Sequence, residues 1–197
     1  NKLLFTLNQK LAVDSGILAN QLKARQIIET KIPSWQNHKN LIFPKQLSME
    51  QCSSEHTASY KSKICTGESC IDLTGGLGID SFFISKSFKN TIHCEENLEL
   101  QFIAQHNFEC LKAKVESNFT DGIEYLKHTN QIFDLIYIDP SRRNENNTKV
   151  VKLEQYYPNI ILHLNLLLEK GKQILIKTSP LLDIKKSMEQ LPQIKEI

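Results

Sequence analysis

The sequence contains no run of about 20 apolar residues, the length that a membrane-spanning helix needs. It also lacks a basic segment followed by an apolar one at its start, so we expect no signal peptide and a cytoplasmic location. Neither sign of charge dominates, since 24 basic residues stand against 22 acidic ones. The overall charge therefore neither requires nor excludes a polyanionic partner, and any contact with nucleic acid has to come from a local patch.

The cysteine and histidine patterns argue against two further kinds of site. The five cysteines are odd in number and include no Cys-x-x-Cys pair, so the sequence predicts neither a disulfide framework nor a zinc site. The six histidines show no ligand spacing, and we expect no bound metal. Because the chain begins with Asn1 rather than with methionine, we expect it to be part of a longer protein.

Helix and loop signals divide the chain near residue 47. Asp14 or Ser15 can cap a helix that ends before Pro33, and a loop follows it. We therefore expect a small helical extension over residues 1–47 and one larger domain over residues 48–197. A chain of 197 residues, 40% of them hydrophobic, is long enough to bury one sizeable core and to carry such an extension.

The larger domain is predicted to begin with one helix over residues 48–64. Ser48 is followed three residues later by Gln51, which fits a capping box at a helix start. At helical spacing the apolar row of this helix is Cys52, His56, Tyr60 and Ile64. The opposite side carries Ser53, Ser54, Thr57 and Lys61.

From Ser69 onward, apolar strand-like runs alternate with helical patterns. This alternation predicts an α/β fold, a Rossmann-like doubly wound and mostly parallel sheet with helices on both faces. We expect strands at about 69–73, 91–95, 114–119, 132–138 and 173–177. We expect the helices at about 79–88, 97–112, 121–128, 155–170 and 182–191.

The most informative segment runs from Ile71 to Asp80. An apolar run ends at Asp72, three glycines follow at Gly75, Gly76 and Gly78, and a helical pattern comes next. Such a strand, loop and helix form a cradle for a nucleotide-like ligand, because glycines let the backbone approach it closely. A nicotinamide fingerprint needs glycine or alanine where Ser81 stands, so a dehydrogenase is disfavoured. A tight turn without a ligand is the alternative.

Two further strands end in acidic residues. Glu95 ends the second strand 23 residues after Asp72, close to the spacing of about 20 expected for a carboxylate that accepts hydrogen bonds from ribose hydroxyls. The alternative for Glu95 is a solvated residue at a helix start. The fourth strand stops at Asp139 and Pro140, because proline cannot donate to a strand ladder. A polar run over residues 141–148 then predicts a loop.

Four motifs in this order resemble those of the class I S-adenosylmethionine-dependent methyltransferases, over residues 48–197. The first is Asp-x-x-x-Gly-x-Gly, spanning Asp72 to Gly78, and the second is the segment from Glu95 to Leu100. The third contains Asp121 and Gly122, and the fourth is Asp-Pro-Ser-Arg over residues 139–142. The resemblance implies S-adenosyl-L-methionine as cofactor.

The resemblance also implies roles for individual residues. Asp121 would accept from the adenine amino group while the Gly122 N–H meets a ring nitrogen, although aspartate is also a good helix N-cap. Asp139, together with the Pro140 carbonyl, would hold an N–H of the methyl acceptor, although a loop cap at the strand end is the alternative. The family's sheet closes with two further strands, so we expect the last strands to be missing here.

The fourth motif resembles the Asp/Asn-Pro-Pro-aromatic signature of enzymes that methylate nitrogens of nucleobases, among them the trimethylguanosine synthase group. Ser141 replaces the second proline and Arg142 replaces the aromatic residue. Arg142 and Arg143 are candidates to pair with phosphates of an RNA substrate or with a carboxylate, or they form a solvated pair.

The wider pattern, from Leu47 to Arg143, is similar to bacterial RNA methyltransferase-like proteins that carry a C-terminal THUMP-like domain, which is absent from this sequence. The sequence therefore predicts methylation of a base nitrogen in structured RNA, such as tRNA or rRNA. Two alternatives stay open. One is a small-molecule or protein methyltransferase on the same fold, and the other is a non-catalytic module that binds cofactor or RNA.

Overall fold

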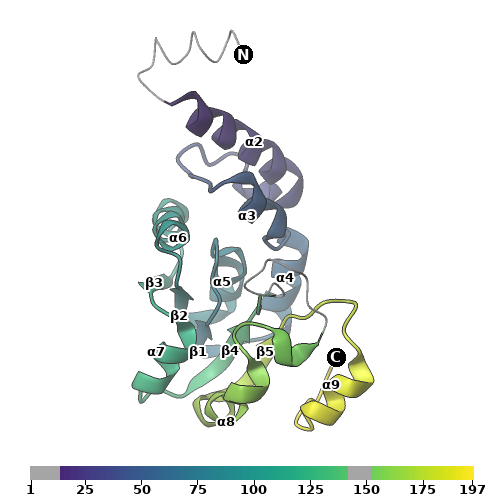
Figure 1. Cartoon of the computed structure of the whole chain (residues 1–197). Helices are drawn as coiled ribbons and strands as arrows, with labels where there is room; N and C mark the ends of the chain where they lie inside the picture. The colour runs from purple at the N-terminus through teal and green to yellow at the C-terminus, as the bar shows by residue number, and fades with distance from the viewer. Residues whose placement is uncertain (1–13, 142–151) are drawn as a thin grey trace.

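The computed structural model describes residues 14–141 and 152–197, and a sheet of five parallel strands lies at their centre (Figure 1). The strands lie in the order β3-β2-β1-β4-β5, and each neighbouring pair is parallel. The chain winds outward from β1 through β2 to β3 and then returns to the other side of β1 for β4 and β5. The prediction of a doubly wound α/β fold is confirmed. The strands are β1 (Gly67–Asp72), β2 (Phe88–Glu95), β3 (Val115–Phe119), β4 (Phe133–Ile138) and β5 (Gly171–Ile176).

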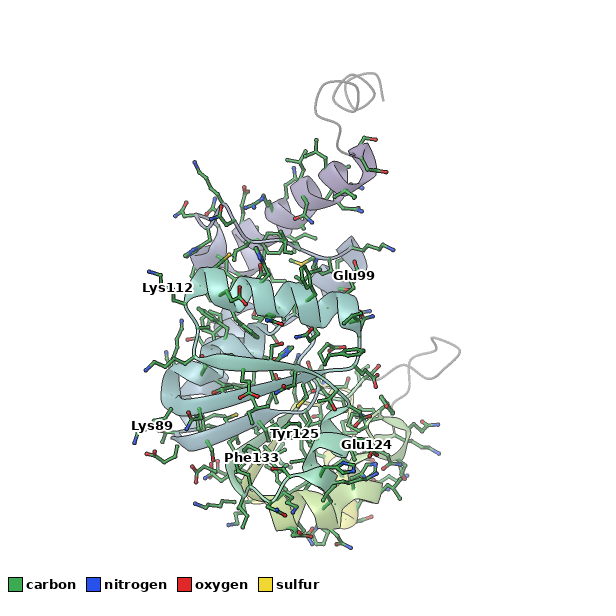
Figure 2. The ribbon with its side chains drawn as sticks, turned by 90° about the vertical axis from the view of Figure 1, so that its left-hand side faces the viewer. Lys89, Glu99, Lys112, Glu124, Tyr125 and Phe133 are labelled. Carbon is green, nitrogen blue, oxygen red and sulfur yellow. The ribbon has the colours of Figure 1, made fainter. Side chains whose placement is uncertain are left out.

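Helices cover both faces of the sheet. Figure 2 shows α6, which ends near Lys112, on one side of the sheet and α7, which carries Glu124 and Tyr125, on the other. The helices that follow the strands are α5 (Ile79–Ile84), α6 (Leu98–Leu111), α7 (Gly122–His128), α8 (Ile160–Lys170) and α9 (Ile184–Gln190). Short 3-10 turns lie at η2 (Ser85–Ser87) and η3 (Leu153–Gln155).

Strand β4, which lies between β1 and β5, packs apolar side chains on both sides because helices cover both faces of the sheet. Ile136 packs in a cluster with Leu126 of α7 and Leu167 of α8. Its strand neighbours Leu135 and Tyr137 pack in another cluster with residues such as Ile84 of α5. This alternation follows from the two-residue period of a strand, which sends successive side chains to opposite faces.

The N-terminal helix α2 (Ser15–Lys31) begins where the sequence predicts. The Asp14 carboxylate accepts hydrogen bonds from the first backbone N–H groups of this helix, at 2.6 Å from Gly16 and 3.3 Å from Ile17. The turn η1 (Pro33–Trp35) follows, and Trp35 is buried edge-to-face against Phe82 of α5. Residues on both sides of position 47 therefore share one hydrophobic cluster. The domain boundary at residue 47 stays a prediction.

Two side-chain amides hold the segment that follows Trp35. The Asn107 side chain of α6 accepts from the Ile42 N–H at 3.0 Å and donates to the Ile42 carbonyl at 2.9 Å. Gln21 of α2 forms the same two-way pairing with Phe43, at 3.1 Å and 2.6 Å. Each amide satisfies both backbone polar groups of one residue, as a neighbouring strand would.

The predicted single helix over residues 48–64 is wrong, because the chain forms two helices there. These are α3 (Gln46–Gln51) and α4 (Glu55–Ile64), and Ser54 rather than Ser48 caps the second one, accepting from the Thr57 N–H at 3.3 Å. The apolar row named from the sequence does not form the buried face of α4, since Tyr60 is 61% exposed and Ile64 is 50% exposed. Ala58 and Lys61 are buried instead.

Two boundary differences have local causes. The predicted helix over 155–170 begins only at Ile160, because a residue before proline avoids the helical region and Asn159 caps the helix by accepting from the Leu162 N–H at 3.0 Å. Strands β1, β2 and β5 begin two or three residues earlier than predicted. Their first residues are mostly polar, and backbone pairing extends through them whatever the side chain.

Replacing Asn107 with alanine tests the attachment of the N-terminal segment. The variant leaves the N–H and carbonyl of Ile42 without their side-chain partner, so we expect the free energy of unfolding to fall by about 2 kcal/mol. Gln105→Ala on the same helix is the matched control, because Gln105 is exposed and its hydrogen bonds go to side chains of the same helix rather than to the N-terminal segment. Urea unfolding of both variants is the measurement, and equal losses would contradict this role of Asn107.

Candidate functional site

A pocket of about 530 Å³ lies at the carboxyl ends of the strands, where the strand order reverses between β1 and β4. This is the position at which open α/β sheets bind their ligands. Its walls come from the segments that follow β1, β2, β3 and β4 and from helix α3. The lining residues are Glu50, Gln51, Leu73, Thr74, Cys94, Glu95, Glu96, Thr120, Asp121, Gly122, Ile123, Asp139, Pro140, Ser141, Tyr157 and Pro158.

The structure brings together five of the residues singled out from the sequence. They line the pocket and are Glu95, Asp121, Gly122, Asp139 and Pro140. Four others are not among the lining residues: Asp72 at the end of β1, and Gly75, Gly76 and Gly78 of the glycine loop. Arg142 and Arg143 lie outside the described residues, so their role as substrate contacts stays a prediction.

The glycine loop packs against the protein itself. A Cβ on Gly75 would lie 2.1 Å from the His93 ring, and a Cβ on Gly78 would lie 2.2 Å from the Phe108 ring. Gly76 and Gly78 also have positive φ angles of 54° and 74°, which side chains disfavour. The close approaches that require glycine at 75 and 78 are therefore to neighbouring rings of the core.

Asp72 lies buried beneath the loop. Its carboxylate accepts from the Thr74 N–H at 3.0 Å and from the Ser81 hydroxyl at 2.5 Å. Burial raises the pKa of Asp72 to about 7, and the two hydrogen bonds oppose that rise. Asp72 thus fixes the start of the loop and of helix α5, and Ser81 is its hydrogen-bond donor.

Glu95 is held at the pocket wall by two backbone N–H groups. Its Oε2 accepts from Gly76 and its Oε1 accepts from Asn97, both at 2.7 Å. Burial raises the pKa of this carboxyl, and the hydrogen bonds from Asn97 and Gly76 counter it. The glycine loop therefore orients Glu95 at the end of β2.

Asp121 uses its two carboxylate oxygens differently. Oδ1 caps α7 by accepting from the N–H groups of Ile123 and Glu124, at 2.7 Å and 3.0 Å. Oδ2 accepts from the Tyr157 hydroxyl at 3.1 Å. A Cβ on Gly122 would lie 2.4 Å from the Leu73 carbonyl, so glycine is required where α7 approaches the end of β1. Capping alone does not account for Asp121, because one oxygen remains directed at a donor from across the pocket.

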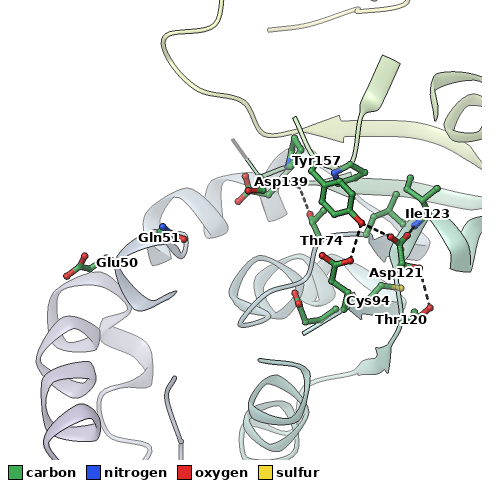
Figure 3. A pocket seen from close by; sticks show the side chains of 16 residues that line it. Glu50, Gln51, Thr74, Cys94, Thr120, Asp121, Ile123, Asp139 and Tyr157 are labelled. Carbon is green, nitrogen blue, oxygen red and sulfur yellow. Dashed lines mark hydrogen bonds between the residues drawn. The ribbon is translucent and has the colours of Figure 1, made fainter. Parts of the chain in front are cut away.

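Tyr157 is a pocket residue that the sequence analysis placed inside a helix. Its hydroxyl lies 3.1 Å from Asp121 Oδ2 and 3.2 Å from Glu96 Oε2, as Figure 3 shows with dashed lines. Burial, followed by the hydrogen bond to Asp121, raises the pKa of Tyr157 to about 12. Two backbone hydrogen bonds join Tyr157 to Ser141, at 2.7 Å and 3.0 Å. Pro158 was the signal in the sequence that could have placed Tyr157 in a loop, because the residue before a proline avoids the helical conformation.

Asp139 is fixed by two residues that the sequence analysis did not single out. Its N–H donates to the Thr74 hydroxyl at 2.7 Å, which links the end of β4 to the end of β1 (Figure 3). Its Oδ2 accepts from Lys177 Nζ at 2.5 Å. Lys177 ends the strand predicted at 173–177, so its position beside Asp139 follows from parallel pairing of that strand with β4.

The described part of the chain contains neither a metal-binding cluster nor a membrane-spanning helix. Within residues 14–141 and 152–197, no three His, Cys, Asp or Glu side chains are grouped so as to hold a metal ion. None of the helices in these two ranges has the length and apolar character needed to cross a membrane. The predicted cytoplasmic location stays a prediction.

The raised pKa of Asp72 predicts a pH dependence of stability. The unfolded chain loses this proton near pH ~4, whereas the folded protein loses it at about pH 7. Ionisation of Asp72 therefore lowers the free energy of unfolding as the pH rises through this window. We expect Asp72→Asn, relative to the wild type, to become more stable from pH ~4 to pH ~7 and then to level off.

Urea unfolding across this pH range measures the difference between the two proteins. Burial lowers the pKa of His93 to about 4, so His93 contributes a slope of the opposite sign. Both proteins contain His93, so its slope cancels in the difference. A difference that does not change with pH would contradict the raised pKa.

Comparisons with known proteins agree with this geometry. The chain is 31% identical over 99 residues to an uncharacterized RNA methyltransferase of Mycoplasma mobile, and the match covers 50% of this chain and 27% of that protein. The crystal structure of a "putative methyltransferase" from Porphyromonas gingivalis W83 matches with a TM-score of 0.75 and 29% identity, over 89% of this chain and 44% of that one. No family model matches the chain.

A more distant structural match shows the fold alone. The tRNA (uracil-54, C5)-methyltransferase of Pyrococcus abyssi, solved in complex with S-adenosyl-L-homocysteine, matches with a TM-score of 0.51 and 17% identity, over 77% of this chain and 33% of that one. The chain spans less than half the length of each of these three proteins. The similarity to THUMP-like and trimethylguanosine synthase proteins stays a prediction. The sheet, its order and the structural matches identify the fold as that of the Rossmann-like, S-adenosylmethionine-dependent methyltransferases.

Proposed function

We propose that the protein is an S-adenosylmethionine-dependent methyltransferase that methylates a nitrogen of a base in structured RNA, tRNA or rRNA. One observation carries the proposal. Three carboxylates from the ends of different strands, Glu95, Asp121 and Asp139, line one cavity of about 530 Å³ at the switch point of the sheet. That volume lies within the range of roughly 300–1,000 Å³ for small-molecule and cofactor pockets.

The pocket residues fit the cofactor. Two backbone N–H groups hold the Glu95 carboxylate at the pocket wall. In this proposal the carboxylate accepts hydrogen bonds from both ribose hydroxyls. Asp121 Oδ2 accepts a hydrogen bond from the Tyr157 hydroxyl, which shows that this oxygen is available to a donor in the pocket, and in this proposal the adenine amino group is such a donor. The Gly122 N–H, at the start of α7, would meet a ring nitrogen. In this proposal Asp72, Gly75, Gly76 and Gly78 shape the loop and orient Glu95.

Methyl transfer depends more on alignment of the donor with the acceptor than on acid catalysis. When bound, the cofactor supplies a methyl group on a positively charged sulfur, which leaves without protonation. The protein therefore has to hold the acceptor nitrogen in line with that methyl group. We assign this role to Asp139, whose carboxylate would accept an N–H of the acceptor together with the Pro140 carbonyl.

An RNA substrate is supported by the similarity to the Mycoplasma mobile protein, which is described as an RNA methyltransferase. The formal net charge is only +2, so binding of RNA depends on local positive groups. We propose Arg142 and Arg143, which follow Asp139, Pro140 and Ser141 in the sequence, as contacts to RNA phosphates. Two alternatives remain: the methyl acceptor is a small molecule or a protein, or the protein binds its ligand without turnover. Experiments with RNA distinguish both alternatives from this proposal.

Glu95→Ala tests the cofactor site. The variant removes a charged acceptor of two hydroxyl hydrogen bonds, so we expect the affinity for S-adenosylhomocysteine to fall at least about tenfold. Calorimetry of S-adenosylhomocysteine binding is the measurement. Glu99→Ala is the control, because Glu99 is exposed in the first turn of α6 and does not line the pocket. Unchanged affinity in Glu95→Ala would remove the ribose assignment.

Asp139→Ala separates the handling of the acceptor from binding of the cofactor. Because Asp139 would touch only the acceptor, we expect kcat to fall by about 100-fold while the affinity for S-adenosylhomocysteine changes less than about twofold. The substrate in this assay is RNA from cells that lack the protein. Nucleoside mass spectrometry of the same RNA before and after reaction identifies the methylated base. If no nucleoside changes in any RNA fraction, the RNA part of the proposal is wrong.

A further inference from the structure

The carboxylate of Asp139 is bound by a lysine from the neighbouring strand. Lys177 Nζ lies 2.5 Å from Asp139 Oδ2, and each side chain is about one-third exposed. The Lys177 N–H donates to the Ile138 carbonyl at 2.9 Å, which continues the pairing of β5 with β4. Lys177 and Asp139 therefore lie side by side at the carboxyl ends of two paired strands, although 38 positions separate them in the sequence.

Lys177 has a second anchor on a different element. Its Nζ also donates to the Ser53 hydroxyl at 3.0 Å. Ser53 is buried in the break between α3 and α4, and its hydroxyl donates to Asp80 Oδ2 at 2.7 Å. The serine hydroxyl proton is thus committed to Asp80, so its oxygen is presented to the ammonium of Lys177 as an acceptor.

A buried ion pair holds Ser53 and Asp80 in place. Lys61 Nζ of α4 lies 2.6 Å from Asp80 Oδ1, with both side chains 9% exposed, and it also donates to Ser53 Oγ at 3.3 Å. The Tyr137 hydroxyl, from β4, donates to Asp80 Oδ2 at 2.7 Å and accepts from Lys61 at 2.9 Å. Burial raises the pKa of Tyr137, which keeps this phenol a neutral donor. Two ammonium groups and two carboxylates therefore form one continuous network.

We propose that Lys177 is a positioning residue, which fixes the Asp139 carboxylate at the pocket and is itself fixed by Ser53 and the buried Lys61–Asp80 pair. This inference rests on the proposed function, because it assigns Asp139 to the acceptor. Lys177 is not among the residues that line the pocket, so it acts through Asp139. With Oδ2 occupied by the ammonium, the carboxylate presents Oδ1 to an acceptor N–H.

The exposure of the Asp139–Lys177 pair argues for positioning rather than for stability. An ion pair that is one-third exposed is screened by solvent and contributes little to folding. A second pair on the same two strands provides the comparison. Lys172 Nζ lies 2.8 Å from Asp134 Oδ1 near the start of β5 and β4, at the opposite end of both strands from the pocket.

The test compares Lys177→Met with Lys172→Met in the full chain. Both variants remove one ammonium, Lys172 within β5 and Lys177 directly after it, but only the second lysine contacts Asp139. We expect Lys177→Met to lower kcat at least about tenfold, with S-adenosylhomocysteine affinity and KM for the cofactor within about twofold of the wild type. Lys177→Arg should recover most of the loss, and Ser53→Ala should lower kcat in the same direction by a smaller factor. Lys172→Met should keep the wild-type kcat.

Crystal structures of wild type, Lys177→Met and Lys172→Met give a readout that does not depend on turnover. We expect the Asp139 carboxylate to move or lose its single orientation in Lys177→Met only. An unmoved carboxylate, or a kcat equal to that of Lys172→Met, would overturn the inference. If the wild type transfers no methyl group to any RNA fraction, the proposed function fails, and the crystal structures still decide whether Lys177 fixes Asp139.

Discussion

A buried ion pair between Lys61 and Asp80 joins helix α4 to helix α5, and Tyr137 ties the pair to strand β4. Charges removed from water are stable only when they are paired and hydrogen-bonded. This pair therefore constrains the orientation of α4 and the position of the chain just before it. It requires α4 to turn Lys61 inward, which leaves Tyr60 exposed on that helix. It also requires a donor to Asp80 from the chain just before α4. Ser53 is that donor, and the helix break before Ser54 puts it there.

The sheet topology turns this local constraint into a site. Parallel strands end at the same edge, so residues that are far apart in the sequence meet there. Thr74 after β1, Glu95 at the end of β2 and Asp139 after β4 reach one pocket in this way. Their hydrogen bonds run between strand ends: Asp139 to Thr74, and Glu95 to the glycine loop after β1. The pocket is therefore preorganised by backbone groups, which suits a reaction that depends on alignment.

The glycine loop shows how one sequence pattern has two physical causes. Glycine at 75 and 78 is required by the rings of His93 and Phe108, whose own edge-to-face packing fills the space beneath the loop. At Gly76 a Cβ would come no closer than 4.0 Å to another atom, but this residue has a positive φ angle and an N–H that holds Glu95. A glycine motif that is usually interpreted as a ligand-binding loop is therefore also required here for packing against the core, and the two roles are compatible.

The sequence by itself determined the order of strands and helices, the acids at strand ends and the cap at Asp14, because these depend on local periodicity and on hydrogen bonds to nearby residues. It did not determine which face of α4 is buried, because the hydrophobicity of the side chains predicts that Tyr60 rather than a lysine is buried. Only the tertiary structure supplied the partner, Asp80, that makes a buried Lys61 stable. Lys177 and Tyr157 likewise acquire their roles from neighbours that no local pattern encodes, because those contacts cross the sheet and the pocket.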